Sequence, residues 1–103
     1  MLGRYRELIE HLTKFIIIEP KNNKALMYRR QVYYILCRYE ESFVDLNKVL
    51  NIDPKHAKAL RHRGQVYFTV KRYKESLADL SRSLEPDNAV ALGSQGQTYY
   101  MLN

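Results

Sequence analysis

Histidine and cysteine are the side chains in this sequence best suited to bind a metal ion. The chain has three histidines and one cysteine, and these residues are His11, His56, His62 and Cys37. They fall on different predicted elements, and the spacing of His56 and His62 does not place both on one face of a helix. A zinc site needs about four converging ligands, so the sequence predicts no metal site.

Motifs for catalysis or nucleotide binding are absent from the sequence. It contains no His-Glu-x-x-His, no Gly-x-Ser-x-Gly and no Walker loop. The stretch Gly93-Ser94-Gln95-Gly96 resembles a phosphate-binding loop, but it lies inside a predicted helix and no Lys follows it. The sequence therefore predicts that the protein is not an enzyme and needs no cofactor.

The charge of the chain is strongly basic. Seventeen Lys and Arg residues against eleven Asp and Glu residues give a net charge of +6 at pH 7. This excess favours an acidic partner, or it serves only solubility. No segment has the pattern of a signal peptide or a membrane span, and a lone Cys37 forms no internal disulfide. We therefore expect a reducing, cytoplasmic location and no membrane partner.

An internal repeat organises the whole chain. The stretch Gln65-Val66-Tyr67-Phe68 matches Gln31-Val32-Tyr33-Tyr34, 34 residues earlier, and Gln97-Thr98-Tyr99-Tyr100, 32 residues later. Arg-Tyr pairs that begin at residues 4, 38 and 72 have the same period. A fixed period in the range of about 20 to 50 residues predicts stacked helical units. Most of the nine tyrosines therefore fit core packing better than stacking on nucleic-acid bases.

Two kinds of predicted helix alternate within this repeat. We call B helices those that end near Pro20, Pro54 and Pro86, because proline cannot continue a helix. We call A helices those that follow the polar turns after these prolines, where Asn or Asp can cap a helix N-terminus. The A helices are expected at about 23–36, 57–70 and 89–102. The chain order is then B, A, B, A, B, A, which makes six helices.

The repeat resembles a known family. The pattern Leu60-x-x-Arg63-Gly64-x-x-Tyr67, Ser76-x-x-x-Leu80 and Pro86 is similar to the tetratricopeptide repeat, and the copy that begins at Leu26 has the same spacing. The resemblance implies an all-α solenoid in which antiparallel helix pairs form a right-handed superhelix, with A helices lining its concave groove. The predicted single domain, 1–103, comprises helix B of a partial repeat (1–20), a full repeat (23–54), a full repeat two residues shorter (57–86) and helix A of a partial repeat (89–103).

Charged residues depart from the family pattern in the predicted core. Arg30 stands where later repeats have Gly64 and Gly96, so its side chain must reach solvent or spread the helices. Arg29 and Arg63 replace an apolar residue, while Asp45 and Asp79 recur with the same period. These residues form a ladder of ion pairs between helices, or each is solvated independently, and the sequence leaves both alternatives open.

The A helices carry the candidate binding residues. Lys24, Met27, Gln31 and Tyr34 are spaced by three, four and three residues, so they share one helical face. By resemblance to the family, this face and its repeat equivalents line the groove. The candidate groove residues are Lys24, Met27, Tyr28, Gln31, Tyr34, Lys58, Arg61, His62, Gln65, Phe68, Gln97 and Tyr100.

These residues suit a peptide as the ligand. Glutamine can hydrogen-bond an extended peptide backbone, aromatic rings accept apolar side chains, and Lys and Arg accept carboxylates. The sequence thus predicts a non-enzymatic scaffold that binds a protein or peptide segment, possibly an acidic one. Family members that grip the acidic tails of heat-shock chaperones use Lys, Asn, Asn, Lys and Arg, whereas the matching positions here hold Met27, Gln31, His62, Val90 and Ser94. The resemblance therefore does not imply that this chain binds chaperone tails.

Two other functions stay open at this level. The basic surface would suit RNA or another polyanion, although nucleic acid is the less favoured partner. The chain would otherwise be an architectural segment that stacks end to end, because the first B helix lacks its own A helix and the last A helix lacks its B helix. Such head-to-tail self-association is expected to be weak.

Overall fold

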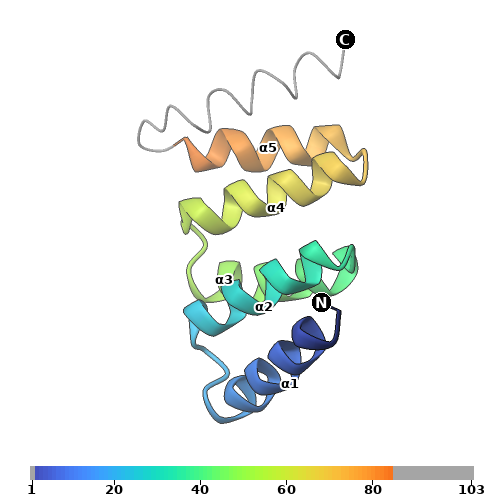
Figure 1. Ribbon diagram of the computed structural model, residues 1–103. Coiled ribbons are helices and arrows are strands. Elements are labelled where there is room, and N and C mark those ends of the chain that lie inside the picture. Colours follow the sequence, from blue (N-terminus) through green and yellow to red (C-terminus); the bar gives the residue numbers. More distant parts are fainter. Residues whose placement is uncertain (1, 85–103) are drawn as a thin grey trace. The chain divides into compact units, whose positions relative to one another are not determined.

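The computed structural model describes residues 2–84, which form five α-helices (Figure 1). They are α1 (Leu2–Ile18), α2 (Asn23–Ile35), α3 (Tyr39–Ile52), α4 (Ala57–Thr69) and α5 (Tyr73–Ser83). The all-α class is confirmed, and these helices match the expected B and A segments closely. Five helices are described rather than the six expected, because the last A helix, 89–103, lies outside the described residues.

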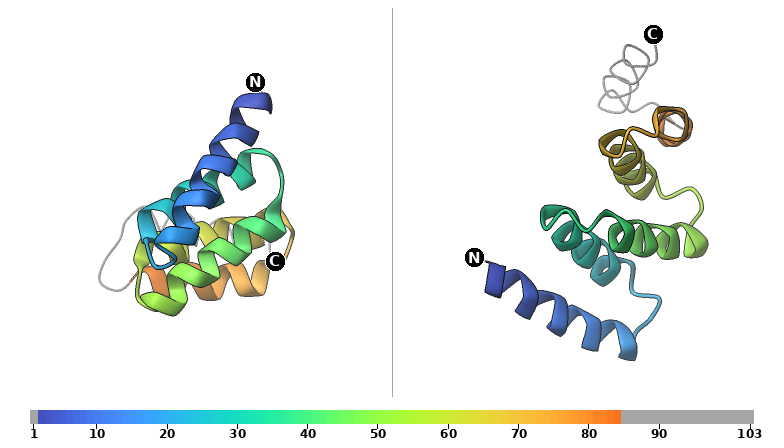
Figure 2. Two further views of the ribbon diagram at one scale, coloured as in Figure 1. Left: turned by 90° about the horizontal axis from the view of Figure 1, so that it is seen from below. Right: turned by 90° about the vertical axis from the view of Figure 1, so that its right-hand side faces the viewer.

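The chain divides into two compact units, Met1–Ile52 and Asp53–Asn103. In the first unit α2 packs against both α1 and α3, and in the second unit α4 packs against α5. Within each unit the A helix and the following B helix run side by side in opposite directions (Figure 2). We call α2–α3 the first hairpin and α4–α5 the second hairpin.

Each A helix begins at a side-chain cap in the turn before it. The Asn22 Oδ1 atom accepts a hydrogen bond from the Ala25 N–H at 3.0 Å, and the His56 Nδ1 atom accepts one from the Ala59 N–H at 3.1 Å. These caps satisfy N–H groups that the first turn of a helix leaves without a partner. The polar turn after each proline therefore fixes where the A helix starts.

Each A helix ends in the same tight turn. Cys37 and Lys71 adopt left-handed backbone conformations, with φ of 59° and 68°. Behind them, the Arg38 N–H donates to the Tyr33 carbonyl and the Arg72 N–H donates to the Tyr67 carbonyl, both at 2.8 Å. This is the Schellman arrangement, which normally places glycine at the left-handed position. It reverses the chain within about three residues and so makes the hairpins tight.

The core of each hairpin consists of the small and aliphatic residues that recur with the 34-residue period. Leu26 and Leu60 are buried on the A helices, and Leu46 and Leu80 are buried on the B helices. Ser42 and Ser76 are also buried, where each hydroxyl donates to a backbone carbonyl of the neighbouring A helix. Burial of these side chains supplies most of the free energy that holds each hairpin together.

Within residues 2–84, no helix combines the length and the apolar composition that crossing a membrane requires.

Candidate functional site

The exposed face of α2 is a continuous stripe of four side chains. Lys24, Tyr28, Gln31 and Ile35 are all exposed, and their spacing of four, three and four residues places them along one side of the helix. The exposed fraction is 63% for Tyr28 and 48% for Ile35, which is high for large apolar side chains. We call these four residues the α2 face.

The equivalent face of α4 is more polar. Lys58, Gln65 and Thr69 are exposed, and Arg61 and His62 beside them are half-buried. The Thr69 hydroxyl donates to the Gln65 backbone carbonyl at 2.9 Å, one turn earlier on the same helix. We call these five residues the α4 face.

The predicted site residues divide between these two faces, with some exceptions. Met27, Tyr34 and Phe68 are half-buried beside the faces rather than at their centres. The Tyr34 ring packs edge-on against Tyr39 with centroids 5.5 Å apart, and Phe68 packs in the same way against Tyr73 at 5.4 Å. These rings therefore help to hold the hairpins together. Gln97 and Tyr100 lie outside the described residues.

Ile35 is a face residue that the sequence analysis missed. It follows Gln31 by four residues and Tyr28 by seven, so helical spacing alone would have placed it on the stripe. The predicted face ran from Gln31 to Tyr34 instead, because an aromatic residue recurs at the matching repeat positions. The Ile35 side chain, which is 48% exposed, adds an apolar end to the α2 face.

Both faces carry cationic side chains and no carboxylates. Neither α2 nor α4 contains an Asp or Glu residue, while α3 and α5 carry carboxylates in their first turns. A cation on an A helix is therefore neutralised only where a B helix supplies an acid. Two arginines, Arg29 and Arg63, are neutralised in this way.

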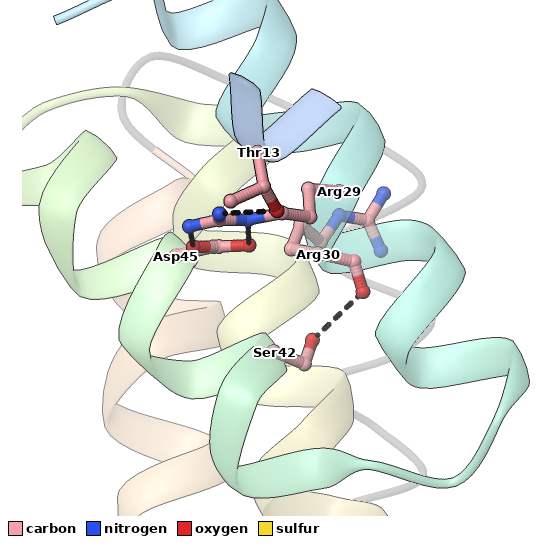
Figure 3. Close-up of polar contacts among 5 residues, drawn as sticks. All are labelled: Thr13, Arg29, Arg30, Ser42 and Asp45. Carbon is pink, nitrogen blue, oxygen red and sulfur yellow. Dashed lines mark hydrogen bonds and ion pairs between the residues drawn. The ribbon is translucent and has the colours of Figure 1, made fainter. Parts of the chain in front are cut away.

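Arg29 is neutralised by Asp45 in the core of the first hairpin (Figure 3). The guanidinium donates from Nε to Asp45 Oδ2 at 2.9 Å and from Nη2 to Oδ1 at 2.7 Å. A further hydrogen bond of 3.1 Å runs from Nη1 to the Thr13 hydroxyl of α1. The hydrogen bonds to Asp45 raise the pKa of Arg29 above its usual value. This two-point pair links α2 to α3, and Thr13 extends it to α1.

Arg63 and Asp79 form the equivalent pair in the second hairpin. The two hydrogen bonds, from Nε to Oδ2 and from Nη2 to Oδ1, measure 2.7 Å and 2.8 Å. Hydrogen bonding to Asp79 raises the pKa of Arg63 as well. Ion pairs between helices, one of the two alternatives that the sequence left open, are thus confirmed in both hairpins. Neither arginine has its charge free for a ligand.

Arg30 has no such partner. The residue is only 7% exposed, so most of its side chain is buried rather than extended into solvent, the first of the two alternatives that the sequence left open. Its Nε atom is buried without a hydrogen-bond partner in the described part of the chain, and Figure 3 shows the side chain directed away from Asp45. Burial lowers the pKa of Arg30 below its usual value, because charge is costly away from water. Lys24 on α2 and Lys58 on α4 are the exposed cations of the two faces.

Between residues 2 and 84, no group of three or more His, Cys, Asp or Glu side chains could hold a metal ion. Cys37 is exposed and is a free thiol. The two faces present hydrogen-bonding, aromatic and cationic groups.

No family model and no curated protein matches the sequence, but solved structures do. The first TPR of Spaghetti (RPAP3) bound to the HSP90 peptide SRMEEVD has a TM-score of 0.88 and 26% identity, over 98% of this chain and 82% of that chain. The Arabidopsis OM64 TPR domain has a TM-score of 0.82 and 26% identity, over 93% and 81% of the two chains. The Sgt2 TPR domain from Aspergillus fumigatus has a TM-score of 0.86 and 21% identity, over 97% and 69%.

These neighbours share the helical repeat that the 34-residue period predicted, and they span nearly the whole chain. TPR domains are non-enzymatic scaffolds, in agreement with the prediction that the protein is not an enzyme. From the repeat pattern, the paired helices and these structural neighbours, we conclude that the chain has the tetratricopeptide repeat fold.

Proposed function

We propose that the protein is an interaction scaffold that binds an acidic peptide segment of a partner protein along the α2 and α4 faces. The observation that carries this proposal is the absence of Asp and Glu from both A helices, together with the exposed Lys24 and Lys58. With no carboxylate on the same helix, these lysines attract a negative ligand without local competition.

The uncharged residues of the two faces suit a peptide better than a bare polyanion. Tyr28 and Ile35 expose apolar surface, and the Gln31 and Gln65 amides can each donate and accept a hydrogen bond. A peptide backbone requires both donors and acceptors, whereas phosphates require donors only. The combination therefore favours an acidic peptide with at least one apolar side chain over RNA.

The solved neighbours support a peptide ligand but not the same contacts. One of them, the first TPR of Spaghetti (RPAP3), was solved with the peptide SRMEEVD. Three of the family's carboxylate-gripping positions hold Met27, Gln31 and His62 here, none of which is a lysine or asparagine. We therefore propose recognition of distributed acidic side chains, with Lys24, Lys58 and Arg61 as the cations.

The resemblance also underlies the choice of these faces. In the TPR family the A helices line the binding groove, and we propose a binding role for the exposed faces of α2 and α4 here. Gln97 and Tyr100, outside the described residues, stay predicted binding residues.

A peptide selection tests the proposal without a known partner. Random peptides displayed on phage are selected on the immobilised full chain, and in parallel on a chain with Lys24→Glu and Lys58→Glu. We expect peptides rich in Asp and Glu with an interspersed apolar residue from the first selection, and loss of that enrichment on the variant. Both substitutions fall on exposed side chains, so the fold should persist.

Two results would contradict the proposal. One is enrichment of peptides without an acidic bias, or equal enrichment on the variant. The other is a salt response typical of a polyanion binder, in which affinity falls by orders of magnitude between about 50 and 200 mM salt while a single-stranded RNA probe competes fully. The second result would assign the surface to nucleic acid instead.

A further inference from the structure

The α2 and α4 faces differ at the positions best placed to distinguish one ligand from another. Lys24 and Gln31 on α2 correspond to Lys58 and Gln65 on α4, so these two positions are the same on both helices. Three further pairs of equivalent positions change chemical class, and they are Met27 and Arg61, Tyr28 and His62, and Ile35 and Thr69. The repeat therefore keeps a lysine and a glutamine on each A helix, and it replaces apolar residues of α2 by cationic or polar residues on α4.

Apolar surface is the distinguishing feature of the α2 face. Tyr28 is 63% exposed and Ile35 is 48% exposed, and they are separated by about two helical turns along the same side. Single exposed apolar residues are common on protein surfaces, but here two large ones lie before and after Gln31 along one helix. Covering such surface with an apolar group removes it from water, which is favourable. The α2 face therefore favours an apolar or aromatic side chain of a ligand.

Arg61 is the distinguishing residue of the α4 face. It follows the lysine of this face by three residues, so the two cations are neighbours on one side of the helix. The two carboxylates of α5, the helix that packs against α4, are already paired with other arginines. Asp79 pairs with Arg63 at 2.7 Å, and Glu75 pairs with Arg72 at 2.6 Å. The α4 face therefore offers its positive charge to a carboxylate that comes from outside the hairpin.

We propose that the two faces recognise different side chains of the partner, an apolar one at the α2 face and carboxylates at the α4 face. This inference rests on the proposed function and extends it, because it assigns a ligand group to each face. Tyr28 and Ile35 determine specificity on α2, and Arg61 determines it on α4. The lysine and the glutamine that the two faces share supply contacts common to both.

Each face also disfavours the group that the other recognises. A carboxylate set between Tyr28 and Ile35 would lose water against two apolar side chains, beyond the first turn where Lys24 lies. An apolar side chain set against Arg61 would take water from a guanidinium and return no hydrogen bond. The specificity of the two faces thus comes from unfavourable contacts as well as favourable ones.

The repeat supplies matched variants, since a residue on one A helix can be exchanged for its counterpart on the other. The α2 variant carries Tyr28→His and Ile35→Thr, and the α4 variant carries Arg61→Met. Each incoming residue already occupies the equivalent position of the other A helix, so both variants should fold. The control is Val44→Thr, which removes an apolar side chain of α3 that is 50% exposed. Circular dichroism checks that all three chains keep their helix content.

A peptide selection measures what each face recognises. Random peptides displayed on phage are selected on the full chain, on each variant and on the control. On the α2 variant we expect the enrichment of apolar residues to fall at least about three-fold, while the enrichment of Asp and Glu is kept. On the α4 variant we expect the enrichment of Asp and Glu to fall at least about three-fold, while that of apolar residues is kept. The control should select the same peptides as the full chain.

Calorimetry with one selected peptide then pairs each face with its ligand group. The peptide is compared with a form in which its apolar residue is alanine and a form in which one acidic residue is replaced by its amide. In a double-mutant cycle, the alanine form should lose about ten-fold in affinity for the full chain and the α4 variant, but little for the α2 variant. The amide form should lose affinity for the full chain and the α2 variant, but little for the α4 variant.

The outcomes separate this inference from the proposed function. Equal losses for both peptide forms on both variants, or a control that behaves like the α2 variant, would overturn the division between the faces and leave the binding of acidic peptides standing. Acidic peptides without apolar enrichment on the full chain would also overturn the division. A full chain that enriches no acidic peptides would contradict the proposed function, and this inference with it.

Discussion

The two hairpins are built from one sequence pattern but differ at several buried positions, and the largest change in side-chain size is at one of them. Both have a capped A helix, a two-point Arg–Asp pair between their helices, a buried serine bonded to the A-helix backbone and a left-handed turn. The first hairpin has Arg30 where the second has Gly64. The serine hydrogen bond at this position is 3.1 Å in the first hairpin and 2.7 Å in the second. The larger residue thus goes with a looser contact between the helices.

A large side chain is therefore tolerated where the A and B helices approach most closely, if other contacts hold the two helices together. The Arg29–Asp45 pair, further supported by Thr13, crosses the helices one residue away from Arg30. In the second hairpin Gly64 lets Leu80 and Ser76 approach the A helix directly. The first hairpin should therefore depend more on its ion pair, and the second more on its glycine.

Breaking the ion pairs should give the largest effect. Asp45→Ala leaves the Arg29 guanidinium buried and unpaired, so we expect a loss of about 3 to 5 kcal/mol in unfolding free energy. Asp79→Ala should cost less, because the Arg63 pair is more exposed, with side-chain exposures of 18% and 5% against 10% and 1% for the Arg29 pair. Urea denaturation followed by circular dichroism measures both.

Glu41→Ala is the control for this prediction, because it breaks an exposed pair with Arg38 and should cost little. Equal losses for Asp45→Ala and Asp79→Ala would contradict the idea that the first hairpin depends more on its ion pair.

Exchanging the residues at the position shared by Arg30 and Gly64 should give the next largest effect on unfolding free energy. Gly64→Arg places a Cβ atom 3.0 Å from Leu80 Cγ and 3.3 Å from the Ser76 carbonyl oxygen, and overpacking of this kind costs about 1 to 3 kcal/mol. Arg30→Gly should cost about 1 kcal/mol or less, since the helix penalty of glycine is offset by removal of a buried Nε that no described residue satisfies. Thermal unfolding of both variants ranks them. A cost for Arg30→Gly above that of Gly64→Arg would refute the comparison.

The turns should give the smallest effect, and the same one in both hairpins. Cys37 and Lys71 hold left-handed conformations that cost a side-chain-bearing residue free energy, so glycine at either position should stabilise by about 0.5 to 1 kcal/mol. Lys71→Ala is the control, because alanine meets the same backbone strain as lysine. Stabilisation by alanine equal to that by glycine in thermal unfolding would show that the turn geometry is not the cause.

Much of the fold was predictable because successive repeats carry the same pattern of residues. The prolines, the caps and the recurring Leu26 and Leu60 placed the helices, and the shared period of Arg29, Arg63, Asp45 and Asp79 suggested the ion pairs. The burial of Arg30 was not predictable. Whether a long cationic side chain reaches water depends on the residues around its charged end and not on its position in the repeat. Ile35 was missed for a simpler reason, since a residue without a repeat signature can still complete an exposed stripe. The binding role of the two faces stays a prediction.

Isothermal titration calorimetry tests the central claim, that the A-helix faces bind an acidic peptide, most directly. An acidic peptide from the display selection is titrated at low salt into the full chain and into a chain with Lys58→Glu and Arg61→Glu. The control carries Lys48→Glu and Lys74→Glu, which reverse the same amount of charge at exposed lysines of α3 and α5. We predict that the α4-face variant loses at least about ten-fold in affinity with unchanged helicity, while the control keeps most of its affinity. Unchanged affinity in the α4-face variant, or an equal loss in the control, would contradict the claim.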